Sequence, residues 1–216
     1  MSRAGSARGT PAQKAGYHHG DLRQALLDAT LRLVDQHGPQ GFTLRAAARA
    51  AGVTAGATYH HFEDKEALLA AVAEEGFELF RQALQEAAQR AAPSARERSH
   101  NVGVAYVLFA VQHPTRFRVM VGYGVQARLR REGGAASAMA TYELVRDVLI
   151  EGLKDKPTDA VSDAEVLGWW SVVHGLSFLA IDGHLGETGT SPKRAEVVVR
   201  TVIDALERRE RTAPPQ

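Results

Sequence analysis

Residues 42–62 constrain the fold more than any other part of the sequence, because they encode two short helices joined by a tight turn. Thr43 can cap the first helix, since its hydroxyl accepts a hydrogen bond from an unpaired backbone N–H, and an alanine-rich run follows it. Gly52 falls where that helix must stop, because glycine tolerates the left-handed backbone found there. Val53 then supplies an apolar plug and Thr54 a second cap. This order predicts a helix-turn-helix.

Apolar side chains recur at helical spacing through most of the remaining chain, and no run alternates apolar and polar residues as a half-buried strand would. The sequence therefore predicts an all-α fold, with a three-helix head followed by a larger helical domain. Helices are expected at residues 22–37, 65–90, 95–112, 136–153, 163–185 and 192–209, with a short segment at 115–120. Glycines bracket residues 122–134, which are expected to form a loop.

Composition argues against several other classes of protein. The chain of 216 residues holds no cysteine, which excludes disulfides, thiolate nucleophiles and Cys-ligated zinc and suits a reducing cytoplasm. No window approaches the ~20 uninterrupted apolar residues of a membrane span, and the N-terminus lacks the apolar core of a secretory signal. We therefore expect a cytoplasmic protein without a membrane partner. An enzyme is the rival class, but no nucleophile-plus-base spacing supports it.

The net charge of +1 hides an asymmetry along the chain. Residues 1–65 hold eight Lys and Arg against five Asp and Glu, so this third carries +3 and the remainder carries −2. Phosphate contacts require local positive charge, so DNA is expected at the N-terminal third, although so small an excess also arises by chance. Residues 1–18 are expected to form a disordered basic arm, which either lies along a DNA groove or has no role.

Small and aromatic residues continue the helix-turn-helix pattern at fixed offsets. The pattern consists of Gly52, Val53, Thr54, Gly56, Tyr59, His61, Phe62, Lys65 and Leu68. This pattern resembles the DNA-binding signature of the TetR family of transcriptional regulators, and the resemblance covers roughly residues 20–70. It implies that Tyr59 and Lys65 contact DNA phosphates.

The chemistry of the side chains agrees with that implication, because a phenol and an ammonium are good phosphate partners. The alternative for Tyr59 is packing against the first helix, and Phe62 is expected in the core. Few polar groups are available for base edges, so DNA shape or the basic arm is expected to contribute to recognition. The full set of predicted DNA contacts is Thr43, Arg45, Thr54, Ala55, Gly56, Thr58, Tyr59, His60 and Lys65.

Trp170 and His174 are four residues apart in a nearly all-apolar stretch, so they share one helix face. With Gly175, and with the segment 106–117, they resemble the Trp-His-Gly subgroup of the same family in its ligand and dimer domain. Aromatic residues with a few polar groups suit a small-molecule pocket, while the alternative is an ordinary core. The predicted pocket residues are Tyr106, Phe109, Phe117, Met120, Tyr123, Tyr142, Trp170, His174 and Phe178.

Neighbouring histidines at positions 18–19 and 60–61 raise a metal-binding alternative. Adjacent side chains on a helix point about 100° apart and do not chelate one ion easily. No cysteine or acidic cluster completes a site. The sequence therefore predicts no metal and no cofactor.

Four segments are predicted: a disordered arm at 1–18, a DNA-binding domain at 19–65, a ligand-binding and dimerisation domain at 66–210, and a disordered tail at 211–216. The last two helices are more apolar than one chain needs, which predicts a homodimer joined by a four-helix bundle. The resemblance implies a repressor that binds double-stranded operator DNA with a palindromic sequence and responds to an unidentified small-molecule inducer. An activator or a ligand-independent regulator is the alternative.

Overall fold

The computed structural model describes residues 19–90, 92–132, 136–153, 163–186 and 191–212, so the predicted arm at 1–18 lies outside the described part. The described residues form helices and no strand, which confirms the all-α prediction. The helices are α1 (His19–His37), α2 (Leu44–Ala50), α3 (Ala55–Tyr59), α4 (Lys65–Gln89), α5 (Ala95–Gln112), α6 (Pro114–Val121), α7 (Tyr123–Glu132), α8 (Ala136–Leu153), α9 (Asp163–Ile181) and α10 (Pro192–Thr212).

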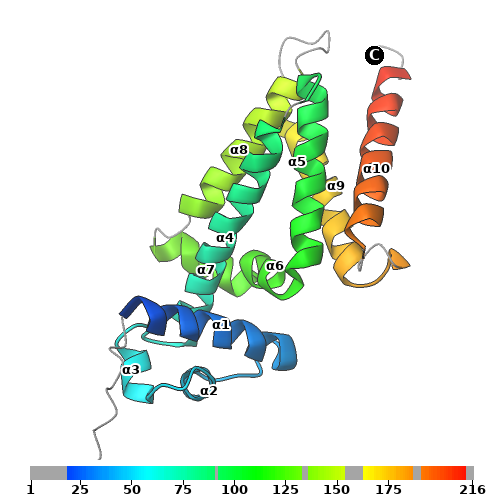
Figure 1. Cartoon of the computed structure of the whole chain (residues 1–216). Helices are drawn as coiled ribbons and strands as arrows, with labels where there is room; N and C mark the ends of the chain where they lie inside the picture. The colour runs from blue at the N-terminus through cyan, green and yellow to red at the C-terminus, as the bar shows by residue number, and fades with distance from the viewer. Residues whose placement is uncertain (1–18, 91, 133–135, 154–162, 187–190, 213–216) are drawn as a thin grey trace, which may run out of the picture.

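Helices α1 to α3 form a small head at one end of the molecule, and α4 runs from this head into the larger body (Figure 1). Fully buried Leu26 and Leu27 of α1 pack in the same apolar core as Phe42 and Phe62, which flank the helix-turn-helix. Gly52 has a φ of +72°, the left-handed conformation that the sequence predicted for the stop of α2.

The body is built around α4 and α5, with α8 packed against both of them and α9 and α10 packed against α5 (Figure 1). The short helices α6 and α7 lie across the end of the body that faces the head. Because α4 belongs to both parts and α6 also contacts α1, the head and the body share a contact surface.

The loop predicted at residues 122–134 is wrong, because residues 123–132 form α7. Glycine lowers helix propensity without forbidding the helix, and neither Gly122 nor Gly124 has a positive φ. Val125 and Leu129 are four residues apart, and Leu129 is buried against the core that α4 contributes to. Tertiary packing therefore overrides the local glycine signal.

Two predicted helix ends are also displaced. Helix α9 ends at Ile181 rather than at residue 185, because the backbone turns through Gly183, whose φ is +79°. Helix α10 continues to Thr212, beyond the predicted end at 209.

Candidate functional site

The two predicted caps of the helix-turn-helix are present. The hydroxyl of Thr43 accepts a hydrogen bond from the N–H of Ala46 at 3.2 Å, and that of Thr54 accepts one from the N–H of Ala57 at 3.2 Å. Both threonines are exposed, and each hydroxyl retains its own O–H to donate. The same side chains that start α2 and α3 are therefore available to a phosphate.

Most of the predicted DNA-contacting residues lie on the surface of the head. Arg45, Gly56, Tyr59 and His60 are exposed, while Ala55 is half-buried. Tyr59 is 52% exposed, which leaves much of its side chain accessible to a partner. Their contacts with DNA remain predictions.

Thr58 differs from these residues, because a predicted DNA contact requires an exposed side chain and Thr58 is not exposed. Its side chain is buried, with 1% of the residue accessible, and its hydroxyl donates to the carbonyl oxygen of Thr54 at 3.3 Å. At helical spacing, Thr58 falls on the face of α3 that turns into the head. It therefore supports α3 from inside and does not present a group to bases.

Lys65 lies at the first position of α4, where backbone N–H groups also point outward. Its ammonium donates a hydrogen bond to the side-chain oxygen of Gln40 at 3.2 Å and lies 5.7 Å from the ring centre of Phe42. Gln40 and Phe42 thus hold the cation close to the helix-turn-helix, in a position suited to a phosphate.

An arginine from the body fastens the start of α4. Asp64 caps α4 by accepting a hydrogen bond from the N–H of Ala67 at 2.6 Å. Arg128 of α7 donates to both oxygens of Asp64, at 2.8 and 2.9 Å, and also to Glu63. The Arg128 side chain is only 10% exposed, so this contact is largely shielded from water on the arginine side. We call these three residues the α7–α4 clasp.

The clasp changes the acidity of its central carboxyl group. Burial raises the pKa of Asp64, but the hydrogen bonds from Arg128 and from the Ala67 N–H outweigh that effect and hold the pKa below its ordinary value of 3.8. Asp64 is therefore ionised at neutral pH, as a helix cap and an arginine partner both require.

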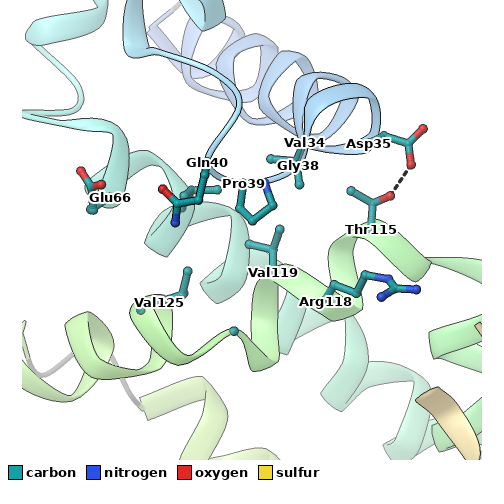
Figure 2. A pocket seen from close by; sticks show the side chains of 13 residues that line it. Val34, Asp35, Gly38, Pro39, Gln40, Glu66, Thr115, Arg118, Val119 and Val125 are labelled. Atoms are coloured by element: carbon teal, nitrogen blue, oxygen red, sulfur yellow. Dashed lines mark hydrogen bonds between the residues drawn. The ribbon is translucent and has the colours of Figure 1, made fainter. Parts of the chain in front are cut away.

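A second contact between head and body encloses a cavity of about 400 Å³ (Figure 2). The end of α1 and the following loop form one wall, with Val34 and Pro39 facing Val119 of α6. The hydroxyl of Thr115 donates to Asp35 across this joint at 2.5 Å. The head thus rests on the body through the clasp and this contact, with incompletely filled space between head and body.

The body contains a larger cavity, of about 640 Å³, between α4, α5, α6, α8 and α9. Its one described polar cluster is formed by Tyr106, Trp170 and His174. The indole N–H of Trp170 donates to the Tyr106 hydroxyl at 3.0 Å, and that hydroxyl lies 2.9 Å from Nδ1 of His174. The remaining described lining is Phe77, Phe80, Met120, Val121, Ala138, Met139, Thr141, Tyr142, Val145 and Val166.

Five of the predicted pocket residues line this cavity: Tyr106, Met120, Tyr142, Trp170 and His174. The prediction is wrong for Phe109, Phe117 and Phe178, which do not line it. Phe109 packs on the ring of Phe80 at 4.9 Å, and fully buried Phe117 packs on Phe178 at 5.8 Å. These rings form the core behind the cavity. Tyr123 begins α7, and its side chain lies outside the described part.

Sequence reasoning missed the contribution of α4 to the cavity and, apart from Tyr142, that of α8. Phe77 and Phe80 are three apart on α4, and Ala138, Thr141, Tyr142 and Val145 follow helical spacing on α8. Such spacing marks an inward face, but it does not distinguish a cavity wall from a filled core. Only the arrangement of the helices reveals the space.

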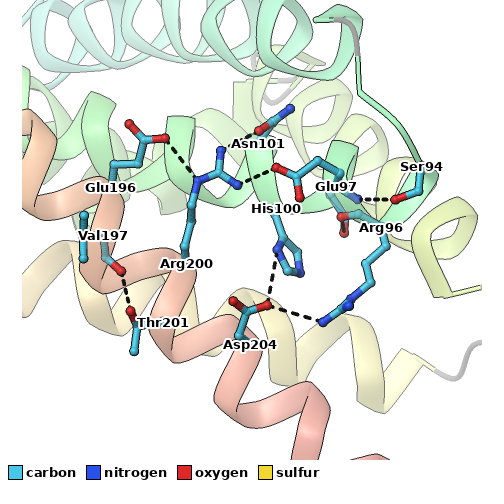
Figure 3. A network of polar contacts seen from close by, with 11 residues as sticks. Ser94, Arg96, Glu97, His100, Asn101, Glu196, Val197, Arg200, Thr201 and Asp204 are labelled. Atoms are coloured by element: carbon cyan, nitrogen blue, oxygen red, sulfur yellow. Dashed lines mark hydrogen bonds and ion pairs between the residues drawn. The ribbon is translucent and has the colours of Figure 1, made fainter.

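Helix α10 is held to α5 by a network of charged and polar groups (Figure 3). Arg200 donates to Glu97 and to Asn101, each at 2.7 Å, and Asp204 accepts from Arg96 at 3.4 Å. Nδ1 of His100 lies 3.8 Å from the same Asp204 carboxylate. All of these contacts join the first half of α5 to α10.

Helices α9 and α10 leave large apolar side chains uncovered. Leu167 is 57% exposed, Leu179 is 43% exposed and Val197 is 65% exposed. Beside them on α9, Gly168 and Gly175 are exposed, and an added Cβ at either would meet open space. Such a face allows close approach of another helix.

Helix α9 is also long and apolar enough to cross a membrane, judged by length and composition alone. A single helix of this kind is weak evidence, because core helices pass the same test. Val166, Val173 and Leu176 of α9 are buried within the protein.

Among the described residues, no group of three or more His, Cys, Asp or Glu side chains is placed to hold a metal ion. His18 lies outside the described part. The absence of a metal and of a cofactor stays a prediction.

A helix-turn-helix head joined to a helical body with an internal cavity defines a class of DNA-binding regulators. Residues 26–72 match the family described as bacterial regulatory proteins, tetR family, and residues 99–206 match the tetracyclin repressor-like C-terminal domain. The second match covers half of the chain. The protein therefore belongs to the TetR family of DNA-binding transcriptional regulators. Membership of the Trp-His-Gly subgroup stays a prediction.

Curated relatives match over a short part of the chain. The transcriptional regulator AcrR of Shigella flexneri is 43% identical over 61 residues, which is 28% of this chain and 28% of that protein. The transcriptional repressor AcnR of Corynebacterium glutamicum is 41% identical over 61 residues, 28% of this chain and 32% of that protein. The chain thus spans about a third or less of the length of these relatives.

Solved structures match almost the whole chain. A protein of unknown function from Rhodococcus sp. RHA1 has a TM-score of 0.69 and 30% identity, over 90% of this chain and 98% of that one. The regulator FadR of Bacillus subtilis, solved with stearoyl-CoA, has a TM-score of 0.64 and 15% identity, over 85% of this chain and 96% of that one. The FadR likeness shows the fold alone.

Proposed function

We propose that the protein is a ligand-responsive repressor that acts in the cytoplasm and binds a palindromic operator as a homodimer. A small molecule in the 640 Å³ cavity would favour a state of the body that no longer holds the heads in the DNA-binding arrangement. By thermodynamic linkage, ligand and operator then weaken the binding of each other by the same factor.

The observation that carries this proposal is the position of the clasp between cavity and head. Helices α6 and α8 supply cavity walls through Met120 and Tyr142, and α7 is the segment that joins them. Arg128 of α7 binds the cap of α4 immediately after the helix-turn-helix. A ligand that shifts α6 or α8 therefore acts on a side chain that positions the head.

The uncovered faces of α9 and α10 support the dimer. Leu167, Leu179 and Val197 would become buried if each pair of helices met its copy around a two-fold axis. Two symmetric heads would then lie about 34–36 Å apart, one turn of DNA, and match a palindromic site.

The similar proteins support a repressor that binds a small molecule. AcnR carries the description of a repressor, and FadR was solved with stearoyl-CoA. An activator, or a regulator that needs no ligand, has the same head and is the second candidate. The position of the operator relative to the promoter decides between activator and repressor.

The proposal is tested by salt-dependent binding of the full chain to DNA from its own upstream region, compared with random DNA. We expect protection of a palindrome by two protomers and a steep fall in affinity with salt. Lys65→Met should weaken binding and lower the salt slope by about 1, whereas Arg146→Met, at an exposed position of α8, should change neither. Equal affinity for the operator candidate and for random DNA would contradict the proposal.

A further inference from the structure

The described lining of the 640 Å³ cavity carries no formal charge. None of its side chains belongs to Asp, Glu, Lys or Arg, and its hydrogen-bonding groups are the hydroxyls of Tyr106, Thr141 and Tyr142, one indole N–H and one imidazole. The hydroxyl of Thr141 is already used, because it donates to the carbonyl oxygen of Ser137 at 2.7 Å. A charged ligand group would lose its hydration here without meeting an opposite charge, which is costly.

The polar cluster has one arrangement of protons that satisfies all its buried members. The indole N–H of Trp170 is only a donor, so the Tyr106 oxygen accepts from it. Burial raises the pKa of Tyr106, an effect that the Trp170 hydrogen bond opposes only in part, and burial lowers the pKa of His174. The phenol therefore keeps its proton and the imidazole is neutral at pH 7.

A neutral imidazole carries its single proton on Nδ1 or on Nε2. If Nδ1 held it, the Tyr106 oxygen would receive two donors and its own O–H, in a residue only 4% exposed, would have no acceptor among its described contacts. If Nε2 holds it, the Tyr106 O–H donates to Nδ1 while the Trp170 N–H donates to the Tyr106 oxygen, so both of these donors have an acceptor. The second arrangement avoids an unsatisfied buried donor, and it leaves Nε2–H as the remaining donor of His174, on a residue that lines the cavity.

We propose that the cavity takes an uncharged, mainly aromatic or apolar molecule that presents one hydrogen-bond-accepting oxygen to Nε2–H of His174. The inference rests on the proposed function of this cavity as a ligand site. The mouth of the cavity favours an aromatic ligand, because Tyr142 of α8 and Trp170 of α9 are each 38% exposed and their ring centres lie 5.9 Å apart. Two such rings offer faces and edges to a flat molecule.

Four probes with one skeleton separate charge from hydrogen bonding: naphthalene, 2-acetylnaphthalene, 2-naphthoate and 2-(aminomethyl)naphthalene. Equilibrium dialysis at pH 7.5 against the full chain gives their affinities. We expect 2-acetylnaphthalene to bind about fivefold more tightly than naphthalene, the size of one net hydrogen bond. The anion and the cation should bind at least about 100-fold more weakly than the ketone, because neither finds a counter-charge.

Substitutions at His174 identify the donor. His174→Phe should bring the ketone and naphthalene to equal affinity, whereas His174→Gln, which retains an N–H donor, should preserve a preference for the ketone. His113→Phe is the matched control, since His113 packs on Phe109 outside the cavity, and it should leave all four affinities unchanged. The ¹⁵N shifts of the His174 ring, assigned with the glutamine variant, should show a proton on Nε2.

Trp170 reports where the probes bind. The chain has two tryptophans, so Trp169→Phe leaves Trp170 as the single fluorophore, and bound ketone should change its emission. Binding without a change in Trp170 emission, or without any effect of His174→Phe, would overturn the inference.

The same probes, added to the operator complex, distinguish this inference from the proposed function. Tight binding of the ketone without release of DNA would support the ligand class and contradict ligand-responsive repression. Release of DNA by the naphthoate or the amine at similar concentrations would support ligand response and overturn the neutral class. If none of the four probes binds, the inference is also overturned, and operator binding alone then decides the proposed function.

Discussion

The head and helix α10 differ in the interactions that hold them in place. The head is closed around fully buried leucines and two phenylalanines, with hydroxyl and carboxylate caps at the helix starts. Helix α10 buries Val199 and Ile203, but its contacts with α5 also include the ion pairs Arg96–Asp204 and Glu97–Arg200, whose side chains are 31–40% exposed. The head should therefore respond mainly to loss of apolar volume, and α10 to charge and salt.

The α7–α4 clasp combines burial, as in the core of the head, with ion pairing, as on α10. Its arginine is nearly as buried as a core residue, while Glu63 and Asp64 keep contact with water at 73% and 44% side-chain exposure. A contact of this kind holds a defined position without the rigidity of a packed core, which suits the two states that the proposed function requires.

The largest expected effect is on the core of the head. Leu26→Ala should lower the free energy of unfolding by about 3 kcal/mol, because it leaves a cavity at a position with no solvent access. The matched control is Leu79→Ala on α4, where the leucine is 41% exposed and the loss should stay below about 1 kcal/mol. Urea unfolding of both variants measures the difference. Equal losses would show that the head is not fixed by its core.

Breaking the clasp should lower stability less than Leu26→Ala does. It should have a larger effect on the coupling between ligand binding and operator binding. Arg128→Met should cost about 1–2 kcal/mol, since it leaves two partly exposed carboxylates without their partner. Arg98→Met, which removes the more exposed pair with Glu151, should cost less than about 0.5 kcal/mol. We also expect the Arg128 variant to lose most of the ligand effect on operator affinity, measured by titration with and without ligand. Unchanged coupling would exclude the clasp as the link.

The attachment of α10 should depend on charge. Arg200→Met removes three hydrogen bonds, to Glu97, Asn101 and Glu196, and should cost about 1 kcal/mol. Hydrogen exchange of α10 amides should accelerate in this variant and, in the unsubstituted protein, at high salt, while amides of α1 remain protected. Arg146→Met on α8 is the exposed control and should leave α10 unchanged. Salt-independent exchange of α10 would contradict the comparison.

The smallest expected effect is on the free energy of unfolding at acidic pH. Because the pKa of Asp64 is lowered by folding, its contribution to stability is complete above 3.8 and is lost as the pH falls below that value. The loss should be less than about 1 kcal/mol, since solvent screens a carboxylate that is partly exposed. Asp64→Asn should flatten this part of the pH–stability curve, measured by urea unfolding between pH 5 and about pH 2.5. The same slope in both proteins would show that residues other than Asp64 cause the loss of stability in acid.

The helix-turn-helix was predictable because its signals are local. A cap, a stop glycine and a second cap act through backbone hydrogen bonds between residues three or four apart, and Thr43, Gly52 and Thr54 adopt the expected roles. The same local reasoning failed for Thr58. Whether one face of a five-residue helix turns inward depends on the helices packed against it, and the sequence of α3 does not contain that information.

By itself, the sequence determined the all-α fold, the bounds of α5 and α8, and five of the residues that line the cavity, because helical periodicity and strong breakers are read along the chain. Only the tertiary structure decided that residues 123–132 form a helix and that Arg128 reaches Asp64 across 64 positions of sequence. It also decided which aromatic rings face empty space and which pack on one another. These features depend on how separate helices pack against one another. In α7, that packing outweighs the low helix propensity of glycine.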